Sequence, residues 1–134
     1  MGLRIELHDD RVTIDLDGVE QVWALARHLE VPTEHITAAR VMPVDDVHHG
    51  LGWRIGGAYW PGAVAAGHFT VPDRPGARQF WCVYRDRDVL VIDTDLERPC
   101  RLVLQHPDRE FLAWIIGERA GGRTVGEPGG PTGE

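Results

Sequence analysis

The stretch RIGGAYWPGAVAAGHF, which runs from Arg54 to Phe69, decides the fold class of this chain. It contains four glycines and one proline, the two residue types that are least favourable inside a helix. The stretch is therefore predicted not to be helical. Its first part indicates an aromatic, glycine-rich loop over residues 53–62, and the run that follows indicates a strand over residues 63–71.

Three further strands are predicted on the C-terminal side of this stretch. The sequence PDRPG at residues 72–76 has the composition of a turn. Residues 78–84 and 89–94 are short apolar segments joined by the charged sequence RDRD, and residues 102–105 form another. Short apolar runs bounded by turn residues are typical of strands.

The N-terminal side also begins with strands. Apolar and polar residues alternate over residues 3–8 and again over residues 12–16, a period that indicates half-buried strands. Asp9 and Asp10 between them indicate a tight turn, so these two segments are predicted to form a hairpin. A later strand is predicted over residues 35–44, followed over residues 45–52 by a polar loop or one short turn.

Two segments have helical periodicity. Apolar residues recur every three or four positions over residues 18–29, with Asp17 as a candidate cap. The last helix is predicted to begin at residues 106–108, where Pro107 suits a first turn, and to end at Gly121. The glycine- and proline-rich residues 121–134 are predicted to be a disordered tail.

The order of these elements predicts an α+β domain over residues 1–120. A strongly bent, mostly antiparallel sheet with the C-terminal helix packed at one end would bury the apolar faces of these elements. The regular alternation of strand and helix that a parallel sheet requires is absent from the sequence.

Composition narrows the classes of function. The formal net charge is −7, and the arginines between residues 74 and 87 are interleaved with aspartates, so neither nucleic acid nor an anionic membrane surface is an expected partner. The two cysteines are not in a CxxC arrangement and are expected to be reduced. The N-terminal residues lack the apolar core of a signal peptide, and we expect a cytoplasmic location.

Four segments resemble the bacterial pleckstrin-homology-like domain family. They are LEVPTEHITAARV, WRIGGAYWPGAVAAGHF, RQFWCVYRDRDVLVIDT and RLVLQHPDREFLAWI. The resemblance implies a bent barrel of about seven strands, closed at one end by the C-terminal helix. It also implies a binding or assembly module without catalytic residues or cofactor.

The same resemblance argues against one ligand class. Family members that bind phosphoinositides use a basic loop between the first two strands. Here that loop is HDDR, from His8 to Arg11, so phosphoinositide binding is not expected.

The first candidate site is aromatic. Trp53, Tyr59 and Trp60 flank the glycine-rich loop and could anchor a protein partner, since aromatic side chains offer a large apolar area with few torsions to restrict. The alternative is that they fold back and cover the mouth of the barrel.

The second candidate site is polar and would make the chain an enzyme or a metal protein. Carboxylates and imidazoles suit a divalent metal. The residues of this type that lie near one another in sequence, with one more distant histidine, are Asp45, Asp46, His48, His49 and His68. No HExxH or paired-cysteine spacing supports this reading, and an exposed polar loop is the simpler interpretation.

The sequence also contains residue types that could form a catalytic group without a metal. His68 and Asp93 could act as a base and its orienting carboxylate, with Cys82 or Thr94 as nucleophile. The chain contains no serine and no GxSxG motif. The sequence thus favours a non-enzymatic module that binds protein, including another copy of itself. The alternative is a small-molecule or metal-dependent enzyme that uses the region of His48, His49 and His68.

Overall fold

The computed structural model describes residues 3–16, 28–48, 52, 54–60, 64–72, 74–84 and 87–125, and shows an α+β fold built on two sheets. The smaller sheet contains three antiparallel strands in the order β1-β2-β3. Their bounds are Leu3–Leu7 for β1, Arg11–Leu16 for β2 and His28–Pro32 for β3. The predicted N-terminal hairpin is therefore confirmed.

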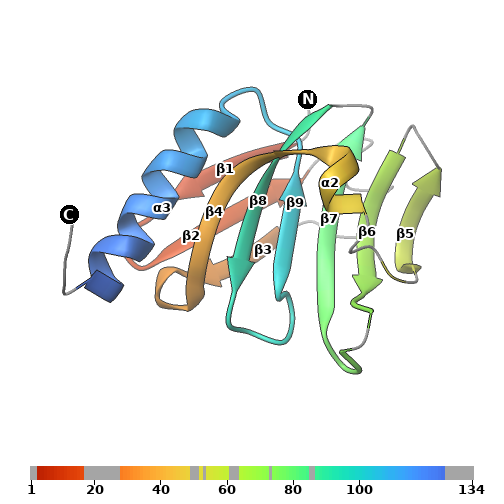
Figure 1. Cartoon of the computed structure of the whole chain (residues 1–134), viewed down its shortest axis with the longest axis horizontal. Helices are drawn as coiled ribbons and strands as arrows, with labels where there is room; N and C mark the ends of the chain where they lie inside the picture. The colour runs from red at the N-terminus through yellow and green to blue at the C-terminus, as the bar shows by residue number, and fades with distance from the viewer. Residues whose placement is uncertain are drawn as a thin grey trace.

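The larger sheet has six strands in the order β4-β8-β9-β7-β6-β5 (Figure 1). Neighbouring strands are antiparallel except for β7 and β9, which are parallel. The bounds are Ile36–Pro43 for β4, Arg54–Trp60 for β5, Val64–Thr70 for β6, Arg78–Tyr84 for β7, Asp88–Thr94 for β8 and Arg101–Leu104 for β9.

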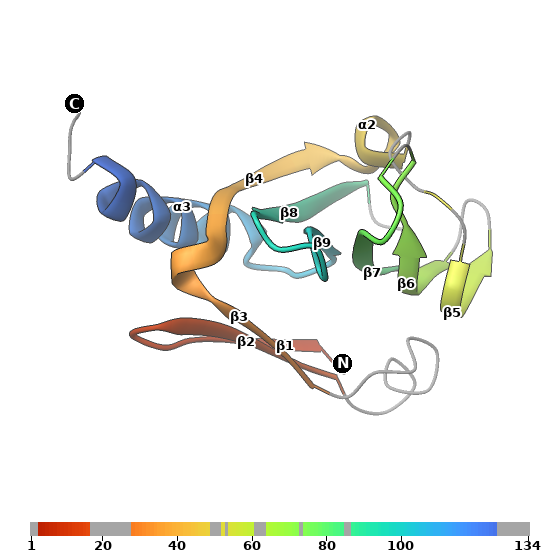
Figure 2. The ribbon, with the colours of Figure 1, turned by 90° about the horizontal axis from the view of Figure 1, so that it is seen from below.

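The chain passes directly from one sheet to the other. The 3-10 turn η1 (Thr33–His35) follows β3 and leads straight into β4. Figure 2 shows this path as a sharp bend, with the small sheet lying beneath the large one. The short helix α2 (Val44–His48) then follows β4.

The main core lies between the two sheets and the C-terminal helix. Alternation in β2 directs Val12, Ile14 and Leu16 into it. The other buried side chains of this core are Val31, Ile36, Ala66, Phe80, Cys82, Leu90, Ile92, Leu102, Leu104, Leu112, Ile116 and Ala120.

A second core lies on the opposite face of the large sheet. Its buried side chains are Val47, Phe69, Trp81, Val83, Val89, Val91 and Val103, with Met42 and Val44 packed against them. The large sheet is thus buried on both faces over its central strands. This burial explains why the sequences of β7, β8 and β9 are almost continuously apolar instead of alternating.

The C-terminal helix α3 (Arg109–Val125) packs along β4 and β8. Leu112, Ile116 and Ala120 form its buried stripe. Gly117 lies close to β4, where a methyl group in place of its hydrogen would be 3.7 Å from a backbone oxygen of β4. Two residues further along the helix, Arg119 Nη1 donates a 2.7 Å hydrogen bond to the carbonyl oxygen of His8.

Three details of the prediction are corrected. The segment over residues 53–62 was predicted as a loop, but residues 54–60 form strand β5. The predicted helix over residues 18–29 mostly lies outside the described residues, and its last two positions, His28 and Leu29, belong to β3. Helix α3 does not end at Gly121 but continues to Val125, because glycine lowers helix propensity without forbidding the helical conformation.

The strands also exceed the seven predicted. The described residues contain nine strands in two separate hydrogen-bonded sheets, and these do not close into a barrel. The predicted turn over residues 72–76 is confirmed for its described residues, 72 and 74–76, where the Arg74 amide donates to the Val71 carbonyl and the Ala77 amide to the Arg74 carbonyl. Gly76 has a φ of 90°, in the left-handed region that favours glycine.

The packing of α3 predicts a difference between two substitutions in the same helix. Ile116 is fully buried and Trp114 is 59 % exposed. Ile116→Ala should lower the free energy of unfolding by about 2–5 kcal/mol, because it leaves a cavity between α3 and the sheets. Trp114→Ala, the control, should change it by about 0.5 kcal/mol or less. Urea unfolding of both variants measures this, and equal losses would contradict the docking of this helix face.

Candidate functional site

The predicted aromatic site falls on the outermost strand of the large sheet. β5 pairs with β6, with Tyr59 opposite Ala65 and Trp60 opposite Val64. Trp53 lies outside the described residues. The structure therefore places two of the three predicted binding residues at adjacent positions of β5, the last strand in the order of the large sheet.

The two edges of the large sheet differ. Helix α3 packs along β4 at one edge. At the other edge, β5 has β6 as its strand neighbour and pairs with no second strand in the described part of the chain. An unpaired edge presents backbone N–H and C=O groups that can hydrogen bond with another strand.

The histidine region predicted as the alternative site is only partly described. His68 lies in β6, half-buried, with its ring centroid 5.2 Å from that of Phe80. Burial lowers the pKa of His68 below its ordinary value, so the ring is favoured in the neutral form. The side chain of His48 and all of His49 lie outside the described residues. Within the described side chains, no three potential ligands gather into a metal site.

His68 and Asp93, which were predicted as a candidate base and its orienting carboxylate, are not in contact. His68 contacts Phe80, which belongs to the core between the sheets. Asp93 lies one residue beyond Ile92, a member of that same core, and therefore on the opposite face of the sheet. The candidate nucleophile Cys82 is also buried in the core between the sheets. The structure does not assemble these residues into one catalytic group.

Asp93 instead holds two arginines from neighbouring strands. Its Oδ2 accepts a hydrogen bond from Arg40 Nη1 of β4 at 2.5 Å, and its Oδ1 accepts one from Arg101 Nε of β9 at 2.8 Å. Burial alone would raise the pKa of Asp93. The hydrogen bonds and positive charges of Arg101 and Arg40 outweigh that effect and hold the pKa below its ordinary value.

Asp93 is among the candidate residues that the sequence predicts, whereas its partners Arg40 and Arg101 are not. Arg40 and Asp93 are far apart in the chain, and only the antiparallel pairing of β4 with β8 brings them together. The available signal was that each arginine lies in or directly before a predicted strand, at a position two residues before an apolar residue of the same sheet face. That signal does not reveal which strands are neighbours.

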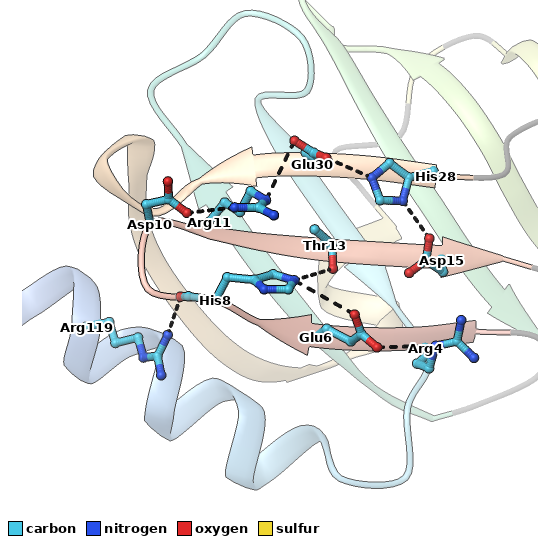
Figure 3. Close-up of polar contacts among 10 residues, drawn as sticks. All are labelled: Arg4, Glu6, His8, Asp10, Arg11, Thr13, Asp15, His28, Glu30 and Arg119. Carbon is cyan, nitrogen blue, oxygen red and sulfur yellow. Dashed lines mark hydrogen bonds and ion pairs between the residues drawn. The ribbon is translucent and has the colours of Figure 1, made fainter.

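The outer face of the small sheet carries a polar network, shown in Figure 3. His28 on β3 contacts Asp15 through Nδ1 at 2.5 Å and Glu30 through Nε2 at 3.0 Å. Glu30 also lies 3.9 Å from Arg11 Nε, and Arg11 Nη1 donates to Asp10 at 2.9 Å. These charges are compensated by one another, as expected for a solvated sheet face.

Within this network, the contacts of His28 change its pKa from the ordinary value of 6.5. The hydrogen bond with Asp15 contributes most and that with Glu30 next, and together they raise the pKa of His28 above 6.5 although desolvation opposes them.

Comparisons with family models, with curated proteins and with solved structures found no match to this chain. Among the described residues, no helix combines the length and the hydrophobicity that crossing a bilayer requires. The site must therefore be interpreted from its own geometry.

The Asp93 cluster predicts a pH-dependent loss of stability. Because the folded pKa is below the ordinary value of 3.8, the carboxylate stabilises the fold above that pH, and the contribution is lost as pH falls through the folded pKa. At neutral pH, Asp93→Asn should lower the free energy of unfolding by about 1–2 kcal/mol, a modest value because both arginines are partly exposed.

Urea unfolding over a range of pH tests this, and the gap between wild type and Asp93→Asn should narrow below pH 3.8. Asp88→Asn, at the start of the same strand, is the matched control and should change stability by about 0.5 kcal/mol or less. A gap that stays constant at all pH values would show that the charge of Asp93 is not involved.

The His28 contacts predict the opposite pH trend. The folded pKa is raised, so the stabilisation is fully present below pH 6.5 and is lost as pH rises through the folded value. NMR titration of the imidazole should give a pKa above 6.5, and Asp15→Asn should lower it more than Glu30→Gln does. A wild-type pKa at or below 6.5 would be inconsistent with these contacts in solution.

Proposed function

We propose that this domain is a non-enzymatic binding and assembly module that pairs with protein, in the first instance a second copy of itself, through strand β5. The observation that carries the proposal is the position of β5 at the end of the large sheet, with β6 as its strand neighbour in the described part of the chain. Addition of a strand at such an edge extends the sheet through main-chain hydrogen bonds.

The sequence of β5 supports this use of the edge. Natural proteins protect exposed edges with charged residues, prolines or inward-pointing charges. The strand RIGGAYW carries one charged residue, Arg54, and no proline within its bounds. A register irregularity lies between Arg54 and Gly56, and from Gly56 to Trp60 the strand carries neither a charged residue nor a proline, which favours pairing of its outer backbone groups.

The aromatic residues supply the specificity in this proposal. Tyr59 and Trp60 stand at consecutive positions of β5, and Trp53 immediately precedes the strand. In strand addition, pockets for alternate side chains select the partner, and buried aromatic side chains contribute most of the affinity.

We also propose that the fold is a variant of the pleckstrin-homology-like fold. Its support is the combination of two packed, mostly antiparallel sheets with a C-terminal helix at one end, together with the sequence resemblance. A cytoplasmic location belongs to the same proposal. Cys82 and Cys100 are buried and form no disulfide, which fits a reducing compartment.

Hydrogen exchange combined with sedimentation tests the binding edge. As the concentration rises into the tens of micromolar, the chain should form dimers, and the β5 amides that point away from β6 should become protected. Trp60→Ala should weaken the dimer at least about tenfold, as expected when an aromatic anchor is truncated. Melting temperature should change little.

Trp114→Ala is the matched control, because it removes an exposed tryptophan from α3, away from this edge. It should leave the dimer unchanged. A clean monomer across the concentration series would exclude self-association. Outer β5 amides that are already protected in the monomer would show that the edge is covered by the chain itself.

A further inference from the structure

A pocket of about 360 Å³ lies at one end of the large sheet, away from β5. It is lined by residues where β6 and β8 end and where β7 and β9 begin, and the connections from β6 to β7 and from β8 to β9 contribute to it. These connections are joined by hydrogen bonds: Arg98 Nε donates to the Gly76 carbonyl at 2.8 Å, and the Arg78 amide donates to the Glu97 carbonyl at 2.9 Å. The volume of the pocket falls in the range of small-molecule sites, roughly 300–1,000 Å³.

One arginine in this pocket is held in place by the sheet. Asp93 binds the Nε of Arg101 at 2.8 Å, while its second oxygen binds Arg40. This arrangement leaves the two terminal amino groups of Arg101 available to another acceptor, since Asp93 uses only the Nε–H. A guanidinium positioned in this way is suited to bind a carboxylate or phosphate through two parallel hydrogen bonds.

A second arginine approaches from the connection after β6. Arg74 lines the pocket, is exposed, and forms no ion pair with any residue that the structure describes. The lining thus contains two arginines and one aspartate, and Arg40 further compensates that aspartate from outside the lining. The pocket is therefore locally positive in a chain whose net charge is −7.

The rest of the pocket lining is partly apolar, and hydrogen bonds hold its buried Gln79 side chain in position. Gln79 is 2 % exposed, and its side chain donates to the Thr70 carbonyl at 2.9 Å and accepts from the indole of Trp81 at 2.8 Å. Val71 and Pro72 contribute apolar surface, and the buried thiol of Cys100 behaves as another small apolar group.

We propose that this pocket binds a small organic anion, with its carboxylate or phosphate between Arg74 and Arg101 and a compact apolar body against the wall. Two observations carry the proposal: the positioned guanidinium of Arg101, and the second arginine that has no ion-pair partner within the described residues. The site is independent of strand pairing at β5.

NMR titration with benzoate, phenyl phosphate and inorganic phosphate tests the proposal on the whole chain. The two organic anions should shift the side-chain signals of Gln79 and Trp81 in a saturable way. Inorganic phosphate should need at least about tenfold higher concentration, because it cannot bury an apolar group against the wall. Whichever of benzoate and phenyl phosphate binds more tightly identifies the preferred oxyanion.

Arg74→Gln and Arg101→Gln should each raise the Kd at least about tenfold, as expected for loss of a charge-assisted hydrogen bond. Arg4→Gln, which removes the same charge from the small sheet, should leave the Kd unchanged. If Arg101→Gln fails to fold, the exposed Arg74 carries the test. Absent shifts with both organic anions, or an unchanged Kd in Arg74→Gln, would overturn the proposal. Equal affinity for inorganic phosphate and phenyl phosphate would also overturn it, because the wall would then contribute nothing.

Discussion

Burial of the central strands of the large sheet on both faces is the constraint on which the rest of the structure depends. β7, β8 and β9 carry continuous apolar runs, so each run requires a cover on both sides. The small sheet and α3 cover one face. Val47 of α2 packs in the core on the other. The bend from β3 through η1 into β4 follows from this requirement, because it places the N-terminal hairpin under the sheet (Figure 2).

The same constraint directs polar chemistry to the ends and edges of the sheet. Asp93 stands near the end of β8, where the apolar run stops, and there it can be reached by Arg40 and Arg101. Residues of the strand ends and of the neighbouring connections line a pocket at that point. At the far edge, β5 extends the sheet beyond the strands that are buried on both faces. The surface proposed for protein binding and the pocket proposed to bind an anion therefore share no residues.

Much of the fold could be predicted, because the spacing of apolar residues along a segment reflects which of its side chains are buried. The strands over residues 3–8, 12–16, 63–71, 78–84 and 89–94 are confirmed nearly to their ends. The errors occurred where local preference and tertiary context disagree. Glycines suggested a loop over residues 53–62, but pairing with β6 makes residues 54–60 a strand. Gly121 suggested a helix end, but α3 continues through it.

The sequence by itself determined most of the strands, where the C-terminal helix begins, and that the chain carries no motif of a known catalytic class. It determined these properties because each depends on residues close together in the chain. Only the tertiary structure decided that β5 is an edge, that His68 and Asp93 face opposite sides of the sheet, and that Asp93 joins Arg40 to Arg101. The physical reason is that strand order and register arise from contacts between distant segments, and apolar periodicity does not specify which strands become neighbours.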